Sequence, residues 1–242
     1  MLELKDICFT PADSEAGASK EILKNINLTI DERFVAITGP NGSGKSTLAK
    51  IIAGIIQPSS GQILFDGVDI TDFSITERAN AGISFAFQQP VRFKGLTVKD
   101  LLSIAAGKEV NVTEICNYLS EVGLCARDYV NRELNSSLSG GELKRIEIAM
   151  ILARKTKLSI FDEPEAGIDL WSFQNLIRVF EKMHEEIQGS ILIISHQERI
   201  LDIADEIIVI AGGKVQKIGD NKEILSEILK GAGSCKFYQK EE

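Results

Sequence analysis

The sequence predicts an α/β fold with a mostly parallel sheet core, an N-terminal antiparallel β sub-domain and an inserted helical sub-domain. Short apolar runs of strand length recur along the chain and alternate with segments of helical spacing. Strands that are apolar along their whole length are typical of a parallel sheet that helices cover on both faces. These runs are Phe34–Thr38, Ile83–Phe87, Leu158–Phe161, Ile191–Ile194 and Ile207–Ile210.

The N-terminal part of the chain has a different pattern. Two β-prone pieces, Leu2–Phe9 and Ile22–Ile30, are separated by the small and polar stretch PADSEAGASK. A polar, glycine-containing stretch between two β-prone segments is typical of a loop that joins antiparallel strands. We therefore expect an antiparallel sheet at the edge of the molecule.

A mostly helical stretch, residues 90–150, interrupts the series of strands. Helical spacing is clear in Val98–Ala106 and Glu114–Val122. Because strand-like runs lie on both sides of this stretch, we interpret it as a helical sub-domain inserted between two strands. The whole chain, 1–242, is then one domain, with an α/β core at 1–89 and 151–242.

Further helices and a hairpin follow the inserted stretch. Apolar residues from Leu170 to Ile187 keep helical spacing, and Asp169 is a candidate N-cap for that helix. The segments Ile207–Ile210 and Lys214–Ile218 flank an Ala-Gly-Gly turn and predict a hairpin, which a final helix at Lys222–Leu229 follows.

Composition and charge narrow the class of protein. The chain has 242 residues, 44% of them hydrophobic and 26% charged, which is ordinary for a globular protein. A formal net charge of −8 argues against general nucleic-acid binding, because phosphate backbones are bound by clustered Lys and Arg. The sequence shows neither a secretory signal nor an apolar run of the ~18 residues that span a bilayer, which predicts a cytoplasmic protein.

The four cysteines predict neither a disulfide framework nor a zinc site. Cys8, Cys116, Cys125 and Cys235 are widely separated and form no CxxC pair. We interpret the first three as inert thiols. Cys235, in a polar tail, is the one candidate for a reactive thiol.

A glycine-rich loop between a strand and a helix predicts a phosphate-binding site. The residues Gly39, Pro40, Asn41, Gly42, Ser43, Gly44, Lys45 and Ser46 fit the pattern G-x-x-x-x-G-K-[ST]. They follow an apolar strand and precede the helical run Thr47–Ile56. Backbone N–H groups of such a loop surround phosphate oxygens, and the helix N-terminus adds its positive dipole. We expect Lys45 to reach the β- and γ-phosphates of ATP and Ser46 to bind Mg²⁺, with Thr47 also at the nucleotide.

Polar side chains follow three other predicted strands. Asp162 and Glu163 end one strand, Gln88 follows a second, and His196 follows a third. Ligands of open α/β sheets bind beyond the carboxyl ends of the strands. We expect Ser46, Gln88 and Asp162 to be metal ligands and Glu163 to polarise the attacking water. His196 is expected to hold that water or to contact the γ-phosphate.

A second glycine motif, Leu138-Ser139-Gly140-Gly141-Glu142, precedes the helical run Leu143–Ala153. Ser139 and Glu142 have the spacing of a capping box, which explains those two residues. Capping does not explain two consecutive glycines, because glycine weakens a helix start. A second anion site at the helix N-terminus explains them, and both interpretations can hold together.

With these motifs in place, the chain resembles the ABC ATPases, a family of P-loop NTPases, over nearly its whole length. LSGGE is similar to the family signature LSGGQ, with Glu142 at the last position. Gln88 resembles the Q-loop, Ala166–Asp169 the D-loop and His196 the H-loop.

The resemblance implies an ATPase that works as a transient homodimer. In this family two nucleotide-binding domains pair head to tail, and each signature motif closes the partner's ATP. The implied signature contacts are Ser139, Gly140, Gly141 and Glu142. It also implies a D-loop role for Asp169 and an adenine-stacking aromatic near the N-terminus, for which Phe9 is the candidate.

Within the family, several stretches are similar to SufC, the soluble ATPase of iron–sulfur cluster assembly. They are Phe85–Val91, Gly140–Arg145 and Ser195–Asp202. This resemblance implies a scaffold partner of the SufB/SufD type. Pro164 and Leu138 depart from the SufC pattern, and no cysteine cluster here could hold iron and sulfur, so that role comes from resemblance alone.

Two alternatives remain open from the sequence. The first is a nucleotide-binding subunit of an ABC membrane transporter, the common role of single-domain members. The second is a non-hydrolysing interaction protein, which the presence of Lys45, Asp162, Glu163 and His196 disfavours.

Overall fold

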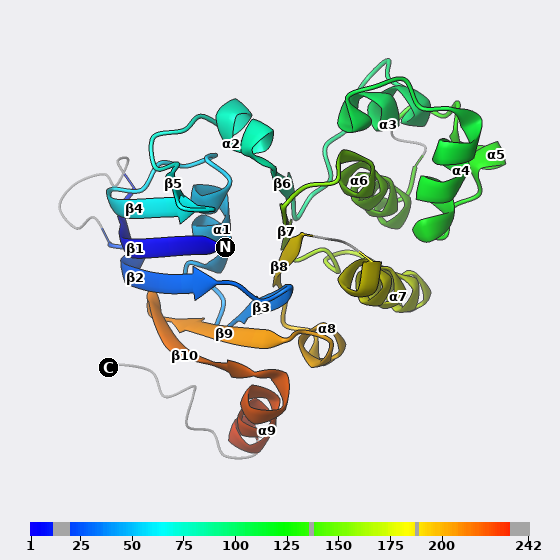
Figure 1. The fold of residues 1–242 in the computed structure, drawn as a ribbon. Coiled ribbons are helices and arrows are strands. Elements are labelled where there is room, and N and C mark those ends of the chain that lie inside the picture. The colour runs from blue at the N-terminus through cyan, green and yellow to red at the C-terminus, as the bar shows by residue number, and fades with distance from the viewer. Residues whose placement is uncertain (12–19, 136–137, 187–188, 233–242) are drawn as a thin grey trace. The chain divides into compact units, whose positions relative to one another are not determined.

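The computed structural model describes residues 1–11, 20–135, 138–186 and 189–232 (Figure 1). Cys235, the candidate reactive thiol, and most of the polar stretch PADSEAGASK lie outside these ranges. The chain divides into two compact units, the first made of Met1–Asp72 and Ile194–Glu242 and the second of Phe73–Ile193. The two units are described separately below.

The first unit contains a four-stranded antiparallel sheet with the order β2-β1-β4-β5 (Figure 1). The strands are β1 (Leu2–Phe9), β2 (Leu23–Ile30), β4 (Ser60–Phe65) and β5 (Val68–Asp69). Leu2 pairs with Ile30 on one side and with Phe65 on the other. The predicted antiparallel N-terminal sheet is therefore confirmed.

The same unit holds the strand that leads into the glycine-rich loop. This strand, β3 (Phe34–Thr38), is buried throughout and runs parallel to β9 (Glu206–Ala211), which forms the predicted hairpin with β10 (Lys214–Asp220). The helices of the unit are α1 (Lys45–Ile52), α8 (Glu198–Asp202) and α9 (Asn221–Ala232).

The expected helix Thr47–Ile56 is wrong at both ends. The helix α1 begins at Lys45 and ends at Ile52. Its end has a physical cause, because Gly54 adopts a left-handed conformation with φ +76°. The N–H group of Ile55 then turns back to the carbonyl oxygen of Lys50 at 2.9 Å, which closes the helix.

The second unit contains three further strands. β6 (Ile83–Ala86) pairs in parallel with β7 (Leu158–Asp162), and β8 (Ser190–Ile194) lies on the other side of β7. All five residues of β7 are buried, as the apolar run predicted. The long helix α7 (Leu170–Glu186) begins after Asp169, whose carboxylate accepts from the N–H group of Ser172 at 3.0 Å. Asp169 therefore caps α7, as expected.

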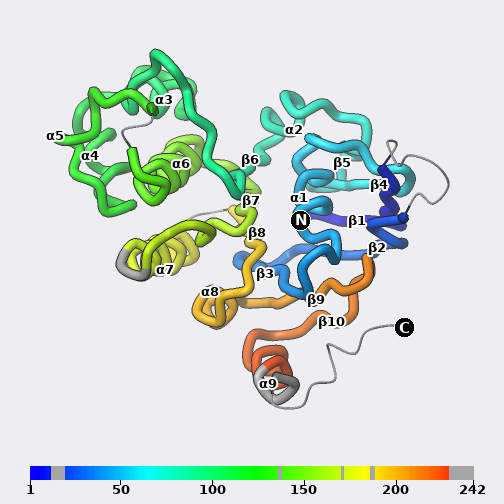
Figure 2. Tube along the Cα trace, turned by 180° about the vertical axis from the view of Figure 1, so that it is seen from behind, coloured from blue at the N-terminus to red at the C-terminus, as the bar shows by residue number. Residues whose placement is uncertain are grey.

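The helical stretch of the second unit gathers around one helix, α6 (Gly140–Arg154). The helices α3 (Val98–Ala106) and α4 (Val112–Glu121) pack against α6, and the short α5 (Ala126–Tyr129) follows α4 (Figures 1 and 2). Residues 90–150, the predicted helical sub-domain, fall within this unit. α4 begins two residues earlier than expected, because Asn111 and Glu114 form a capping box at its start.

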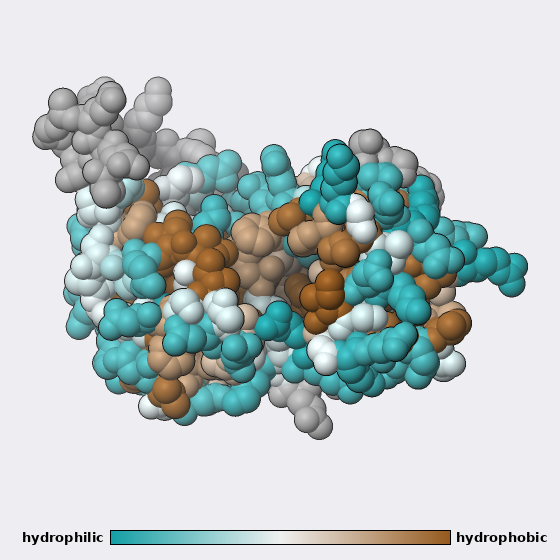
Figure 3. Space-filling view, turned by 90° about the horizontal axis from the view of Figure 1, so that it is seen from above, coloured by the Kyte–Doolittle hydropathy of each residue, from teal (hydrophilic) through white to brown (hydrophobic). Residues whose placement is uncertain are grey.

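The face that Figure 3 shows carries several apolar patches among hydrophilic residues. Val91, Ile104 and Val112 are among the exposed large hydrophobic residues of the second unit. Among the residues that the structure describes, no helix has both the length and the hydrophobicity needed to cross a membrane.

Candidate functional site

The glycine-rich loop has the backbone that only glycines allow. Gly39, Gly42 and Gly44 adopt positive φ values of 136°, 75° and 98°. A Cβ atom at Gly39 would lie 1.9 Å from the carbonyl oxygen of Ile210, and one at Gly44 would lie 2.6 Å from Leu23 Cδ2. The loop therefore lies in close contact with β9 and β2, which leaves no room for a side chain at Gly39 or Gly44.

Two side chains of the loop show where an anion would bind. The ammonium group of Lys45 folds back on the loop and donates to the carbonyl oxygens of Gly39 at 2.8 Å and Pro40 at 2.9 Å. Ser43 Oγ is buried and has no hydrogen-bond partner in the structure. A buried hydroxyl without a partner is costly, and a phosphate oxygen would satisfy it. The described geometry therefore fits a phosphate group.

Phe9 lies at the end of β1, on the strand pair that borders this loop. Its carbonyl oxygen accepts from the N–H group of Ile22 at 2.8 Å. Ile22 and its neighbour Leu23 are the residues that a Cβ atom at Gly44 would contact. The backbone of Phe9 therefore pairs with Ile22, which lies beside Gly44 of the phosphate loop.

His196 is exposed and is held beside the start of the same loop. The preceding residue, Ser195, donates its N–H group to the carbonyl oxygen of Ile37 in β3 at 3.1 Å. Ser195 Oγ accepts from the N–H group of Gln197 at 3.0 Å, which fixes the turn around His196. The phosphate loop, Phe9 and His196 therefore all belong to the first unit.

In the second unit, the two carboxylates at the end of β7 have different surroundings. Asp162 is the last residue of β7 and is only 3% exposed. Glu163, the next residue, has a positive φ of 46°, which turns the chain sharply at this point. Its carboxylate accepts a hydrogen bond from Gln88 Nε2 at 2.7 Å. Gln88 and Glu163, which the sequence placed at neighbouring strand ends, are thus in direct contact.

Lys144 connects the signature helix to Glu163. Its buried ammonium group donates to the carbonyl oxygen of Glu163 at 3.0 Å. Burial lowers the pKa of Lys144, and the negative charges of Glu147 and other nearby carboxylates partly oppose this effect. The backbone that carries the candidate catalytic carboxylate is therefore tied to α6.

Glu147, one turn further along α6, was not identified from the sequence. Its carboxylate accepts from the N–H group of Phe87 at 3.1 Å, directly before Gln88. Burial raises the pKa of Glu147 to about 7, although the bond from Phe87 and the charge of Lys144 act against this. The spacing of Lys144 and Glu147, an oppositely charged pair three residues apart on α6, was the signal that could have revealed it.

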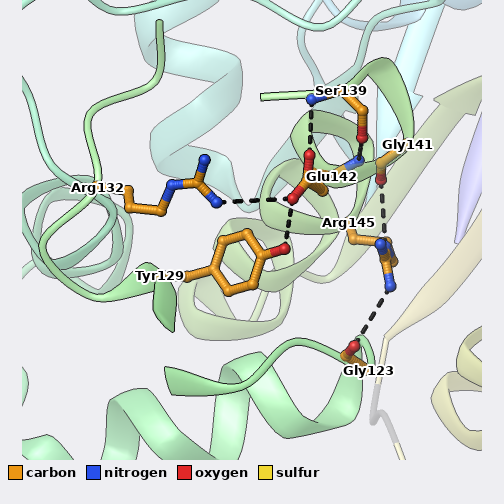
Figure 4. Close-up of polar contacts among 7 residues, drawn as sticks. All are labelled: Gly123, Tyr129, Arg132, Ser139, Gly141, Glu142 and Arg145. Carbon is orange, nitrogen blue, oxygen red and sulfur yellow. Dashed lines mark hydrogen bonds and ion pairs between the residues drawn. The ribbon is translucent and has the colours of Figure 1, made fainter. Parts of the chain in front are cut away.

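The signature motif forms the N-terminus of α6, as Figure 4 shows. The Ser139 side chain accepts from the N–H group of Glu142 at 3.2 Å, and Glu142 Oε2 accepts from the N–H group of Ser139 at 2.7 Å. The capping-box prediction is thus confirmed. The helix begins at Gly140, three residues before the expected start at Leu143, because the capping box makes the glycines its first turn.

The start of α6 lies against the segment that carries Asp169. A Cβ atom at Gly140 would come within 3.9 Å of the carbonyl oxygen of Gly167, and one at Gly141 within 3.5 Å of Ser172 Oγ. Glycines at these positions let α6 approach the start of α7 closely. The second unit therefore brings together Gln88, Asp162, Glu163, the signature motif and Asp169.

A protein-family model described as "ABC transporter" matches residues 23–166, which include the phosphate loop, the signature motif and Glu163. The chain belongs to this family. It is an ATP-binding ABC-type ATPase with the fold that the sequence predicted, a mostly parallel sheet with an antiparallel N-terminal sheet and a helical part.

Curated relatives of this ABC ATPase carry the names of transporter ATP-binding proteins. The chain is 43% identical over 226 residues to an uncharacterized ABC transporter ATP-binding protein of Methanocaldococcus jannaschii, covering 90% of each. It is 36% identical over 219 residues to the probable ATP-dependent transporter ycf16 of Cyanidium caldarium, covering 83% of this chain and 85% of that one. A sulfate/thiosulfate import ATP-binding protein of Synechocystis is 36% identical over 214 residues, which cover 84% of this chain and 57% of that protein.

Solved structures give the same fold. A dimeric ATP-binding cassette in a post-hydrolysis state, bound to ADP and Pi, has a TM-score of 0.80 and 27% identity, covering 91% of this ABC ATPase and 99% of that chain. A subunit from Clostridium perfringens that is part of the ABC transporter complex cbiONQ has a TM-score of 0.77 and 29% identity. The match covers 96% of this ABC ATPase and 94% of that chain.

Proposed function

We propose that the chain is a subunit in which ATP binding joins two copies and hydrolysis separates them, so that an attached partner changes conformation. The observation that carries this proposal is the presence in one chain of two helices that begin at glycine-rich segments, where backbone N–H groups suit an anion. One is the loop at Gly39–Gly44 before α1, and the other is the signature start of α6. A ligand that binds the closed state more tightly than the open one shifts the population toward closure.

The residues around the phosphate loop have distinct roles in this proposal. Lys45 leaves the carbonyl oxygens it now contacts and binds the β- and γ-phosphates, and Ser43, Ser46 and Thr47 contribute hydroxyl groups. Phe9 stacks on the adenine, since its strand pair contacts the loop at Gly44.

Mg²⁺ is part of the same proposal. Ser46, Gln88 and Asp162 would hold the ion, because hydroxyl, amide and carboxylate oxygens are the ligands that Mg²⁺ prefers. The ion supplies positive charge that neutralises the phosphate oxygens. Asp162 fits the role, since it is a buried carboxylate at a strand end.

Glu163 is proposed as the base for hydrolysis. A water attacks the γ-phosphorus, the bond to the β-phosphate oxygen breaks, and the carboxylate accepts the proton of the water. His196 holds that water or the γ-phosphate. In the structure Gln88 donates to Oε2 of the Glu163 carboxylate, and the carboxylate retains further acceptor sites for the proton of the water.

The second copy supplies the signature motif. Ser139, Gly140, Gly141 and Glu142 present a helix start to the ATP of the other copy, and Asp169 lies beside them at the start of α7. A dimeric cassette with ADP and Pi among the similar structures supports this arrangement.

The comparisons favour a membrane transporter as the partner, with the chain acting at its cytoplasmic face. The relatives and structures above are named as transporter ATP-binding proteins or as parts of transporter complexes. The SufC-type role was the first choice from the sequence and has no support from these names. It remains a second candidate only on the similarity of Phe85–Val91 and Ser195–Asp202.

Nucleotide binding is tested with Lys45→Ala. Lys45 is the only charged residue of the loop Gly39–Ser46, so its removal should abolish ATP binding in isothermal titration calorimetry. Lys50→Ala, in the last turn of the same helix, is the matched control and should bind ATP normally. Tight ATP binding by Lys45→Ala would contradict the proposed phosphate site.

Hydrolysis and closure are tested with Glu163→Gln. Gln cannot accept the proton, so hydrolysis should fall by about 10²- to 10⁴-fold. The variant should instead accumulate as an ATP-bound dimer, which light scattering detects. Glu165→Gln, two residues away, is the control that should keep the wild-type rate. A wild-type rate in Glu163→Gln would show that another group acts as the base.

The partner is identified by purifying the protein from its native cells with detergent-solubilised membranes and, separately, from the soluble fraction. Co-purification of an integral membrane protein supports the transporter proposal. A soluble partner rich in Cys and His would instead support the iron–sulfur scaffold.

A further inference from the structure

We propose that Tyr129 and Arg132 are positioning residues that hold Glu142 and so keep the start of α6 ready for the ATP of a second copy. This inference rests on the proposed function, because it assigns residues that act on the signature motif. Neither residue belongs to a motif identified in the sequence, and both act through Glu142.

Three groups converge on the Glu142 carboxylate (Figure 4). The Tyr129 hydroxyl donates a hydrogen bond to Oε1, and the Ser139 N–H group donates to Oε2 at 2.7 Å. The Arg132 guanidinium forms an ion pair with Oε1 at 3.7 Å. Arg132 also lies over the Tyr129 ring, 5.2 Å from its centroid, so each of the two orients the other.

This set of partners suits a carboxylate and not an amide. Every one of the three groups is a hydrogen-bond donor, and a carboxylate accepts on both oxygens. A glutamine, which the resembling family signature has at this position, would direct its own NH₂ group at one of the donors. Tyr129, Arg132 and Glu142 therefore form a matched set, which we call the Glu142 clamp.

The clamp solves an electrostatic problem at the start of α6. A negative side chain in the first turn interacts well with the helix dipole, but it opposes the approach of a second anion. Arg132 supplies the compensating positive charge, and Tyr129 fixes the side chain toward α5. Partial burial disfavours the charged form, but the bonds from Tyr129 and Ser139 and the charge of Arg132 outweigh it and lower the pKa of Glu142.

The clamp leaves the glycine N–H groups available. The capping box uses the N–H groups of Ser139 and Glu142. Those of Gly140 and Gly141 belong to the first turn and have no acceptor within the helix, as in any helix start. A phosphate oxygen of a second copy's ATP would accept from them. If Glu142 were released, its carboxylate could swing toward these groups and repel the phosphate.

The clamp residues are themselves anchored to the start of α3. The carbonyl oxygen of Arg132 accepts from the N–H group of Val98 at 3.0 Å, and that of Val130 accepts from Lys99 at 3.1 Å. The N–H group of Arg132 also donates to the carbonyl oxygen of Tyr129 at 2.9 Å. The clamp is therefore built on a fixed backbone and needs no rearrangement to hold Glu142.

The test measures ATP-dependent dimer formation in the Glu163→Gln background. Tyr129→Phe removes one donor, and Arg132→Gln removes the positive charge while keeping a long polar side chain. Tyr129→Phe should raise the protein concentration for half-maximal dimerisation at saturating ATP by about tenfold, as expected for one lost hydrogen bond to a charged group. Arg132→Gln should raise it by about two- to fivefold, as expected for the loss of a partly exposed ion pair. The affinity of the monomer for ATP, measured with a fluorescent analogue at low protein concentration, should not change.

Matched controls separate the clamp from general destabilisation. Arg127→Gln removes an exposed charge from the same segment, and Tyr118→Phe removes a hydroxyl group from α4. Both should dimerise as the parent does. Urea titrations show that all variants are folded under the assay conditions. Arg132→Lys keeps the charge and should recover part of the dimerisation that Arg132→Gln loses.

A double-mutant cycle with Glu142→Ala shows whether the effect passes through Glu142. In that background Tyr129→Phe should have little further effect on dimerisation, because both oxygens that the hydroxyl group could contact are absent. Parent-like dimerisation of Tyr129→Phe and Arg132→Gln would overturn the inference, as would equal effects with and without Glu142. Failure of the Glu163→Gln parent to dimerise with ATP would instead refute the proposed function, and the inference with it.

Discussion

Replacement of Glu147 by Gln should make the stability of the protein less dependent on pH. Glu147 lies on α6 and accepts from the N–H group of Phe87, and burial raises its pKa to about 7. A Gln side chain at this position can still accept the same hydrogen bond. The substitution therefore removes the titration and retains the contact.

The sign follows from the two protonation states. Between the ordinary pKa of 4.5 and about 7, the folded protein holds a proton on Glu147 that the unfolded chain has lost. The free energy of unfolding of the wild type should therefore fall as the pH rises through this range and level off above it. The shift of the Glu147 pKa from 4.5 to about 7 changes the free energy of unfolding by at most about 3 kcal/mol across this range. In the variant, Lys144 loses the favourable negative charge of Glu147. We therefore expect the gain in stability of Glu147→Gln over the wild type to be smaller, roughly 1–3 kcal/mol.

The assay is a urea titration at several pH values from 5 to 9, followed by the fluorescence of Trp171, the only tryptophan. The stability of Glu147→Gln relative to the wild type should increase between pH 5 and 8. Glu114→Gln is the control, because hydrogen bonds from Lys108 and Asn111 lower the pKa of Glu114. The difference in free energy of unfolding between Glu114→Gln and the wild type should stay constant from pH 5 to 9. A constant difference for Glu147→Gln as well would refute the assignment of a buried, titrating carboxylate.

Three further predictions concern packing and capping. Gly39→Ala places a Cβ atom 1.9 Å from the Ile210 carbonyl oxygen, at a φ of 136°, whereas Gly67→Ala meets open space at a φ of 79°. In urea titrations Gly39→Ala should cost several kcal/mol and Gly67→Ala about 1 kcal/mol, and equal losses would contradict the close contact. Asn111→Ala removes the N-cap of α4 and should lower the free energy of unfolding by about 1 kcal/mol. Leu119→Ala, fully buried on α4, should lower it by about 2–5 kcal/mol in the same assay.

The elements that the sequence predicted best are those with the longest regular patterns. The helices α3 and α7 and the strands that correspond to the apolar runs occur close to the expected positions. These strands are β3, β6, β7, β8 and β9. Helix ends were less accurate, because a single glycine or cap decides them. Gly54 stops α1 four residues early, and Asn111 starts α4 two residues early.

The elements around residues 60–81 were not predicted at all. The strands β4 and β5 and the helix α2 (Ile75–Ala81) are short, so their apolar patterns are weak. Local turn chemistry was nevertheless present in the sequence. Asp66 and Gly67 form the turn between β4 and β5, and Ser74 and Glu77 form a capping box at the start of α2. Both signals depend on a few residues and not on periodicity.

The candidate site divides in the same way. Residue types at strand ends identified Gln88, Asp162, Glu163 and His196, since that position depends only on the local pattern. The contacts made by Glu147 and Tyr129 could not be predicted, because they depend on how α6 packs against β6, β7 and α5. Side chains that act across packed elements need the three-dimensional structure.

These contacts give α6 a definite mechanical role within the second unit. The Glu142 clamp holds its first turn, and Lys144 and Glu147, three residues apart on one face, contact the backbone at Glu163 and Phe87. A helix of 15 residues moves as one body, since each turn is hydrogen-bonded to the next. The same helix therefore contacts the backbone of Phe87, beside Gln88, and the backbone of Glu163. Because Gln88 donates to the Glu163 carboxylate, the signature start and this hydrogen bond are joined through α6 and through the backbone that Lys144 and Glu147 contact.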